Sequence, residues 1–312
     1  MFSGGSADAP LHPTADGPPG GAAYWLRAAD GVRLRVAVWG GDAGRGTVLL
    51  FPGRTECVEK YGRTATDLLA LGFASMVIDW RGQGLADRLI ADAALGHVAD
   101  FADYQLDVAA MLAHARTLNL PQPWYLLAHS MGGCIGLRAL HLGLPVRRAA
   151  FSAPMWGIGI AAPMRPVAWA VSTLARATGL SALLAPGQSR DSFLLTGAFA
   201  GNTLTSDAEQ WSYMKAQLVA MPALALGGPT LRWLNAALRE MRSLQALPSP
   251  TMPTVTFLGT TEGIVDPAKV TERMARWPGA ELVMLSGGRH EVLLESPAIR
   301  ARILARLDAH FA

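Results

Sequence analysis

Residues 124–133, Trp-Tyr-Leu-Leu-Ala-His-Ser-Met-Gly-Gly, constrain the fold of this chain more than any other stretch. Apolar and aromatic residues follow the breaker Pro121-Gln122-Pro123 and predict a short buried strand, and residues 134–144 favour a helix. Ser130 falls on the turn between the two. A serine at such a turn points its hydroxyl away from the sheet, beside the free N–H groups of the helix start. The stretch therefore predicts a nucleophile.

This turn matches the pattern Gly-x-Ser-x-Gly only in part. Ala128 stands where the first glycine is expected, and Gly132 keeps the second. The positions two before and two after the serine crowd each other in such a turn, so a small residue is required at both. Taken alone, the motif also fits an ordinary turn between a strand and a helix.

Strands and helices alternate along most of the chain. Asp30-Gly31 predicts a hairpin of residues 23–28 and 32–39. Further strands are predicted at 47–51, 74–78, 149–152, 254–258 and 281–285, and helices at 58–71, 98–118, 267–276 and 297–311. This alternation predicts an α/β fold with a mainly parallel sheet flanked by helices.

The alternation stops between residues 155 and 250, where helical patterns at 206–218 and 229–244 occur without a buried strand. Ser206 is the predicted N-cap of the first of these helices. We therefore expect a flexible leader over 1–22, a core formed by 23–154 and 251–312, and an inserted helical cap, or lid, over 155–250.

Composition excludes several classes of protein. Of the 312 residues, 51% are hydrophobic and 16% charged, which excludes a disordered chain. The net charge is +3 and the arginines are scattered, so no nucleic-acid partner is expected. Cys57 and Cys134 fit two reduced thiols of a cytoplasmic protein. No signal peptide or membrane span is predicted, which leaves open peripheral contact of the apolar cap with the inner face of a membrane.

A serine nucleophile needs a base and an acid that orients it. His290 follows the last predicted strand and is the candidate base. Glu262 and Asp266 follow the preceding strand. Glu262 is favoured because it is closer to the strand end, whereas Asp266 precedes Pro267 and is suited to cap the next helix. The order serine, acid, histidine is that of α/β-hydrolases.

Other residues around this triad receive predicted roles. The backbone N–H groups of Met131 and Arg54 are the expected donors of an oxyanion hole. His129 is interpreted as structural, since a neighbour on a sharp turn points away from the serine's working face. Asp79 and Arg81 are expected to pair with each other and tie loops together.

At these motifs the chain resembles α/β-hydrolases of the branch that contains serine aminopeptidases, monoacylglycerol lipases and bacterial lysophospholipases. The resemblance runs from about residue 23 to the C-terminus and is carried by four segments: Phe51-Pro52-Gly53-Arg54-Thr55-Glu56 with Glu59-Lys60-Tyr61, Asp79-Trp80-Arg81-Gly82-Gln83-Gly84, His129-Ser130-Met131-Gly132-Gly133, and His290-Glu291. Pro52 replaces the histidine usual in the oxyanion loop, and Glu262 replaces the usual aspartate.

The resemblance implies a serine hydrolase that cleaves carboxylic esters with apolar acyl chains, with lysophospholipids or monoacylglycerols as the expected lipid substrates. No metal or organic cofactor is implied. The alternatives are an aminopeptidase or small-ester esterase of the same fold, an acyltransferase, and a non-catalytic protein that binds an apolar ligand.

Overall fold

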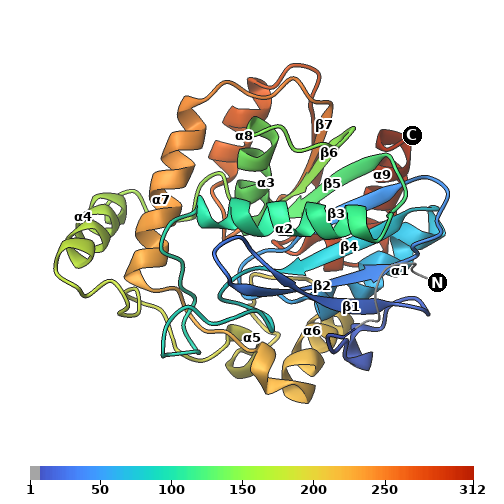
Figure 1. The fold of residues 1–312 in the computed structure, drawn as a ribbon. Coiled ribbons are helices and arrows are strands. Elements are labelled where there is room, and N and C mark those ends of the chain that lie inside the picture. The colour runs from blue at the N-terminus through green and yellow to red at the C-terminus, as the bar shows by residue number, and fades with distance from the viewer. Residues whose placement is uncertain (1–7) are drawn as a thin grey trace.

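A computed structural model describes residues 8–312, and its centre is one sheet of eight strands (Figure 1). The strands are β1 (Ala22–Arg27), β2 (Arg33–Trp39), β3 (Thr47–Phe51), β4 (Ala74–Asp79), β5 (Trp124–His129), β6 (Ala149–Ser152), β7 (Thr254–Gly259) and β8 (Glu281–Leu285). Their order across the sheet is β1-β2-β4-β3-β5-β6-β7-β8. β2 is antiparallel to both β1 and β4, and all other neighbours are parallel. This agrees with the predicted hairpin and mainly parallel sheet.

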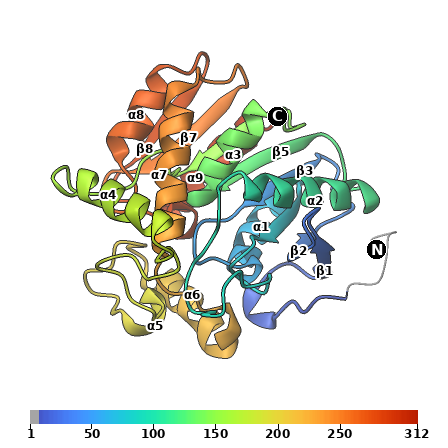
Figure 2. The same ribbon diagram turned by 60° about the vertical axis from the view of Figure 1, so that its left-hand side comes forward.

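Helices cover both faces of the sheet. They are α1 (Gly62–Ala70), α2 (Asp103–Thr117), α3 (Met131–His141), α4 (Met164–Ala177), α5 (Phe193–Thr196), α6 (Ala208–Ala220), α7 (Leu231–Ala246), α8 (Pro267–Ala275) and α9 (Pro297–His310). Short 3-10 helices are η1 (Pro13–Ala15), η2 (Val58–Tyr61), η3 (Pro222–Leu224) and η4 (Val292–Leu294). α2, α3 and α8 pack on one face, and α1 and α9 on the other (Figure 2).

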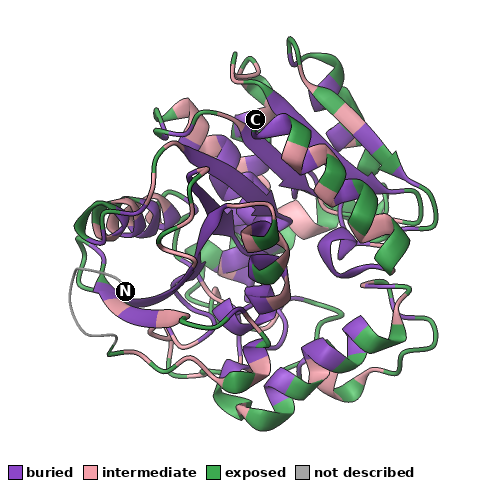
Figure 3. Cartoon of the chain, turned by 90° about the vertical axis from the view of Figure 1, so that its right-hand side faces the viewer, coloured by how far each residue is buried: buried purple, intermediate pink, exposed green. Residues whose placement is uncertain are grey.

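β5 shows why the sheet is buried on both faces. Trp124, Leu126 and Ala128 pack in the core under α2 and α3. Tyr125 and Leu127, which alternate with them, pack in the core under α1 and α9. A continuous apolar strand is therefore the form that a two-sided parallel sheet requires. Figure 3 shows the inner strands buried, with exposure concentrated on the outer helices, the loops and edge strands such as β8.

Residues 155–250, all described, contain α4 to α7 and only isolated bridges in place of strands. We call them the β6–β7 segment. α4 packs on α7 and lies beyond it from the sheet in Figure 1, while α5 packs on α6 and α6 on η1. None of the helices in the described part of the chain is both long and apolar enough to cross a membrane.

Three of the predicted helices differ locally from the structure. The predicted helix at 58–71 is the 3-10 helix η2 followed by α1, and Gly72 closes it with a φ of 88°. The predicted helix at 98–118 begins only at Asp103. Ser206 is not the N-cap of α6: its hydroxyl binds Glu295, and Asp207 caps the helix through the N–H groups of Glu209 and Gln210.

The described part of the predicted leader packs against the rest of the chain. Ala9 forms a bridge with Ala23, and Ala15 in η1 is buried. The Tyr213 hydroxyl of α6 donates to the Ala15 carbonyl over 2.7 Å. The first part of the predicted leader, residues 1–7, lies outside the described residues.

Candidate active site

Ser130 lies on a strained turn between β5 and α3. Its φ of 50° and ψ of −116° are unusual for a residue with a side chain. The turn is stabilised by close packing, because a Cβ on Gly132 would lie 2.0 Å from the Phe51 carbonyl oxygen. Ala128 is fully buried at the position of the missing first glycine. The elbow therefore tolerates alanine before the serine and requires glycine after it.

His290 and Glu262 complete a hydrogen-bonded chain with Ser130. His290 Nε2 lies 2.9 Å from Ser130 Oγ, and His290 Nδ1 lies 2.8 Å from Glu262 Oε2. Ser130 follows β5, Glu262 follows β7, and His290 follows β8. These parallel strands end at the same edge of the sheet, and this brings the three predicted residues together.

The surroundings of Glu262 keep it ionised. Burial alone would raise the pKa of this carboxyl, but the hydrogen bond and charge of His290 lower it below its ordinary value. The N–H groups of Ile264 and Val265 donate to Oε1 over 2.6 and 3.1 Å and lower the pKa further. A carboxylate held in this way can accept the Nδ1–H of His290 and stabilise an imidazolium.

Asp266 has a different partner set. Its Oδ1 accepts the N–H of Ala268 at the start of α8, and its Oδ2 lies 2.9 Å from Arg165 of α4. Of the two acids that the sequence left open, Glu262 contacts His290, and Asp266 caps a helix.

Both expected oxyanion donors have backbone N–H groups without a hydrogen-bond partner among the described residues. Met131 is the first residue of α3, so its N–H has no partner within the helix. The hydrogen bonds of residues 8–312 also leave the N–H of Arg54 unused. The loop before Arg54 is held firmly, because Glu56 Oε2 accepts the Gly53 N–H over 2.5 Å and Gln83 donates to the Gly53 carbonyl.

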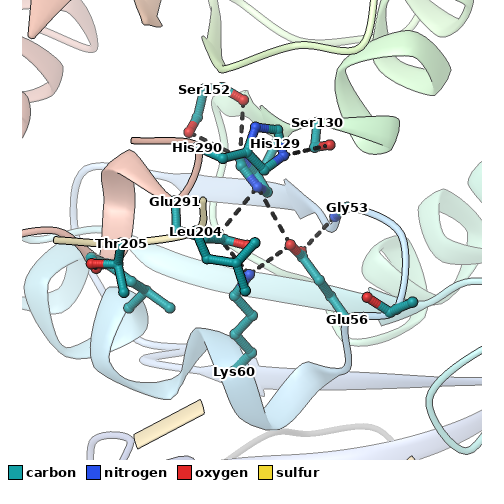
Figure 4. Close-up of polar contacts among 12 residues, drawn as sticks. Gly53, Glu56, Lys60, His129, Ser130, Ser152, Leu204, Thr205, His290 and Glu291 are labelled. Carbon is teal, nitrogen blue, oxygen red and sulfur yellow. Dashed lines mark hydrogen bonds and ion pairs between the residues drawn. The ribbon is translucent and has the colours of Figure 1, made fainter. Parts of the chain in front are cut away.

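A buried group of charged residues lies next to Ser130 and His290 (Figure 4). Lys60 Nζ is 2.6 Å from both Glu56 Oε1 and Glu291 Oε2. His129 Nε2 is 3.4 Å from Glu56 and 3.2 Å from Glu291. Glu56, Lys60, His129 and Glu291 are each at most 6% exposed, and we call them the charge cluster.

The charge cluster holds the carboxylates of Glu56 and Glu291, the Lys60 ammonium and the His129 imidazole. His129 Nδ1 lies 3.0 Å from the carbonyl oxygen and 3.1 Å from the hydroxyl oxygen of Ser152, and Nε2 faces the two carboxylates at ion-pair distance without a hydrogen bond to either. Burial opposes the charge, but Glu291 and Glu56 raise the pKa of His129 above its ordinary value. Glu56, His129 and Glu291 also have ligand atoms close enough for a metal ion, but the Lys60 ammonium already lies between the two carboxylates.

Sequence reasoning missed this cluster. Glu56, Lys60 and Glu291 belong to the segments that carry the family resemblance, but only the spacing of Glu56 and Lys60 hints at a contact. The predicted pair between Asp79 and Arg81 is wrong. Asp79 pairs with Arg35, and Arg81 pairs with Asp30 and Asp107, because Asp79 lies beside β2 and Arg81 faces α2.

An eight-stranded α/β sheet with a serine at a strand-to-helix elbow and a hydrogen-bonded histidine and carboxylate defines the α/β-hydrolases. Residues 42–297 match the model of the serine aminopeptidase (S33) hydrolase family, and the chain belongs to that family.

Known proteins support the same assignment. The chain is 34% identical over 273 residues to lysophospholipase L2 of Escherichia coli K12, covering 81% of this chain and 76% of that protein. It is 28% identical over 277 residues to a probable lysophospholipase L2 of Haemophilus influenzae, covering 86% and 84%.

Among solved structures, a soluble variant of monoglyceride lipase from Saccharomyces cerevisiae matches with a TM-score of 0.70 and 21% identity, covering 92% of this chain and 93% of that chain. The predicted fold and family are confirmed, and the chain is a carboxylic ester hydrolase.

Proposed function

We propose that this protein is a lysophospholipase that releases a fatty acid from a lysophospholipid. The hydrogen-bonded chain Ser130–His290–Glu262 at the elbow carries the proposal, because it is the arrangement that activates a serine for acyl transfer. Lysophospholipase L2 relatives supply the expected substrate class.

The proposed reaction has two half-steps. Ser130 Oγ attacks the ester carbonyl while His290 Nε2 takes the hydroxyl proton, and Glu262 stabilises the imidazolium through Nδ1–H. The N–H groups of Arg54 and Met131 bind the oxyanion. His290 returns the proton to the leaving glycerol oxygen, and an acyl-serine remains. A water molecule, deprotonated by His290, then attacks the acyl-serine, the bond between the acyl carbon and Ser130 Oγ breaks, and His290 returns the proton to Oγ as the fatty acid leaves.

The Arg54 side chain supports a phosphate-bearing substrate over a neutral one. Nη1 donates to the Gly227 carbonyl over 2.9 Å, and the guanidinium lies over the Trp233 ring, 5.6 Å from its centroid. Burial lowers the pKa of this guanidinium to about 10. No carboxylate among the described residues pairs with it. A phosphate diester on the glycerol of the substrate would supply the missing negative charge.

The head-group proposal is tested with Arg54→Gln, which keeps the backbone N–H. We expect the ratio of kcat/KM for lysophosphatidylethanolamine to that for monoacylglycerol to fall about tenfold, the size of one charge-assisted hydrogen bond. Arg88→Gln is the control, because Arg88 is also partly desolvated and donates to a carbonyl of the same region, that of Ala223. An unchanged ratio in Arg54→Gln would refute the head-group proposal alone.

We further propose that residues 155–250 form the cap, and that its outer helix α4 contacts a membrane from the cytoplasmic side. Met164, Val167, Val171 and Leu174 recur on one face of α4, and each is 37–64% exposed. The adjoining face holds the buried Ser172 and Ala175, and Asn235 of α7 donates to the hydroxyls of Ser172 and Thr173. An amphipathic helix with an uncovered apolar face is suited to a lipid surface.

Peptide hydrolysis is less well supported. A peptidase that takes a free amino terminus needs an acidic group to bind it, and the sequence offered Asp191, Asp207 and Glu209. Asp207 caps α6, and Glu209 pairs with Arg63, so two of these acids already have structural partners.

The deciding experiment measures acyl release from lysophospholipids, monoacylglycerols, short p-nitrophenyl esters and aminoacyl anilides, with Ser130→Ala as the control. We expect turnover of lysophospholipids that Ser130→Ala abolishes. Preference for monoacylglycerols would make the protein a neutral-lipid hydrolase, and activity confined to short esters or anilides would overturn the lipase assignment. Acyl transfer to an added alcohol in place of water would identify an acyltransferase. Failure with every substrate would favour a non-catalytic, ligand-binding role.

A further inference from the structure

The charge cluster joins the three loops that carry the proposed catalytic groups. Glu56 lies in the loop of Gly53 and Arg54, His129 directly precedes Ser130, and Glu291 directly follows His290 (Figure 4). Lys60, from η2, contacts the first and the last of these loops at once. One buried ammonium therefore connects the oxyanion loop to the histidine loop.

The same carboxylates also orient backbone and ring groups. Glu56 Oε2 accepts both the Gly53 N–H, over 2.5 Å, and the Tyr61 hydroxyl, over 2.6 Å. The Glu291 N–H donates to the Leu204 carbonyl over 2.7 Å, so the histidine loop is also bound to the β6–β7 segment. Glu56 and Glu291 thus each have a further partner outside the charge cluster that fixes their position.

The cluster is also close enough to act on His290 by charge. The imidazole rings of His129 and His290 lie with their centroids 4.8 Å apart. The titratable groups that face His290 are Glu262 from the β7 side, His129 from the β5 side and Glu291 from its own loop, with Glu56, Lys60 and Tyr61 behind them. In a buried site such neighbours interact strongly, since the effective dielectric constant is far below that of water.

We propose that Glu56, Lys60, His129 and Glu291 are positioning residues that lock the oxyanion loop, the elbow and the histidine loop together and set the electrostatic potential at His290 by holding the two carboxylates against Lys60 and His129. This inference rests on the proposed roles of Ser130 and His290. It requires no particular substrate, because it concerns the proton that His290 takes from Ser130.

Opposite charge changes in the cluster give the sharpest test. Lys60→Met leaves an uncompensated carboxylate near His290. The negative charge stabilises the imidazolium, so His290 loses its proton only at higher pH. Glu291→Gln leaves an excess of positive charge and does the reverse. The rate at which a fluorophosphonate probe labels Ser130 should follow the deprotonation of His290. We expect the acidic limb of the plot of labelling rate against pH to move up by about one pH unit in Lys60→Met and down by about half a unit in Glu291→Gln.

Three controls separate positioning from simple stability. Lys60→Arg keeps the charge and is expected to keep the acidic limb of the unaltered protein. The double variant Lys60→Met/Glu291→Gln removes one charge of each sign and should return the limb toward its original pH. Asp107→Asn weakens the buried pair between Asp107 and Arg81, which lies in the Asp79–Gly84 loop. That pair contacts none of the three catalytic loops, so this variant should leave the acidic limb in place.

Every outcome of these measurements either supports or overturns the inference. Limbs that stay fixed, or that move the same way in Lys60→Met and Glu291→Gln, would overturn the inference while leaving the proposed function intact. If Lys60→Met fails to fold, Glu291→Gln decides alone: a downward shift supports the inference, and no shift or an upward one overturns it. Failure of the unaltered protein to label at Ser130 would refute the triad, and the inference with it.

Discussion

Glu262 and Asp266 differ in what they contact, and this difference can be measured. Glu262 accepts a hydrogen bond from His290, whereas Asp266 accepts the N–H of Ala268 and pairs with Arg165. Glu262→Gln removes the charge that stabilises the imidazolium, so kcat should fall about 10³- to 10⁴-fold. Asp266→Asn should keep kcat within about twofold and lower the free energy of unfolding by about 1 kcal/mol or less. A larger loss of kcat in Asp266→Asn than in Glu262→Gln would reverse the assignment.

His129 gives the protein a pH-dependent stability of known sign. The neighbouring carboxylates raise the folded-state pKa of His129 above its unfolded value near 6.5, despite burial. Its stabilising contribution is therefore complete below about pH 6.5 and is lost as the pH rises through the folded-state pKa. We expect the free energy of unfolding to fall over this range more steeply in the unaltered protein than in His129→Gln.

The comparison of the two proteins is needed because other histidines act in the opposite direction. Burial lowers the folded-state pKa of four of them, which are His97, His114, His141 and His310. These four are common to both proteins, so the difference between the two pH curves isolates His129. Parallel curves in urea denaturation would show that folding does not raise the pKa of His129.

At the scale of elements, the contact between α3 and the end of β3 fixes the elbow. A Cβ on Gly132 would meet the backbone oxygens of Phe51 and Pro52 at 2.0 and 2.6 Å. Backbone cannot rotate away as a side chain can, so Gly132→Ala must push the start of α3 from the oxyanion loop. We expect a loss of about 3 kcal/mol in the free energy of unfolding and a marked fall in kcat.

Gly136→Ala is the matched control in the same helix. Its Cβ would meet only side-chain atoms, 3.1 Å from Leu126 Cδ2 and 3.3 Å from Ala128 Cβ. The gain of up to about 1 kcal/mol from replacing a helical glycine offsets this mild crowding. Equal destabilisation of both variants in chemical denaturation would show that the backbone contact of Gly132 does not fix the elbow.

At the scale of the whole molecule, the sequence predicts the alternating strands and helices and the residues that follow the strands. It does not predict side-chain contacts between residues that are distant in the chain. β3, β6 and β8 have the predicted bounds, because the ends of each run of apolar residues coincide with the ends of the strand. Ser130, Glu262 and His290 could be predicted because each follows a strand of the same parallel sheet. The charge cluster could not be predicted in this way, since Lys60 and Glu291 are far apart in the chain and meet only in the folded protein.

The exposed face of α4 leads to a prediction about the whole molecule on a lipid surface. Leu174 is 64% exposed on this face, and Arg176 of the same helix is exposed as well. Burying one leucine in lipid contributes about 1.5–3 kcal/mol, so Leu174→Glu should weaken binding to vesicles containing phosphatidylglycerol about tenfold or more. Leu142→Glu is the control, because Leu142 is 66% exposed but follows α3, outside the proposed cap. We expect Leu174→Glu to lose turnover of aggregated lysophospholipid while keeping turnover of a soluble short ester, and Leu142→Glu to keep both. Vesicle sedimentation that treats the two variants alike would show that α4 is not the membrane contact.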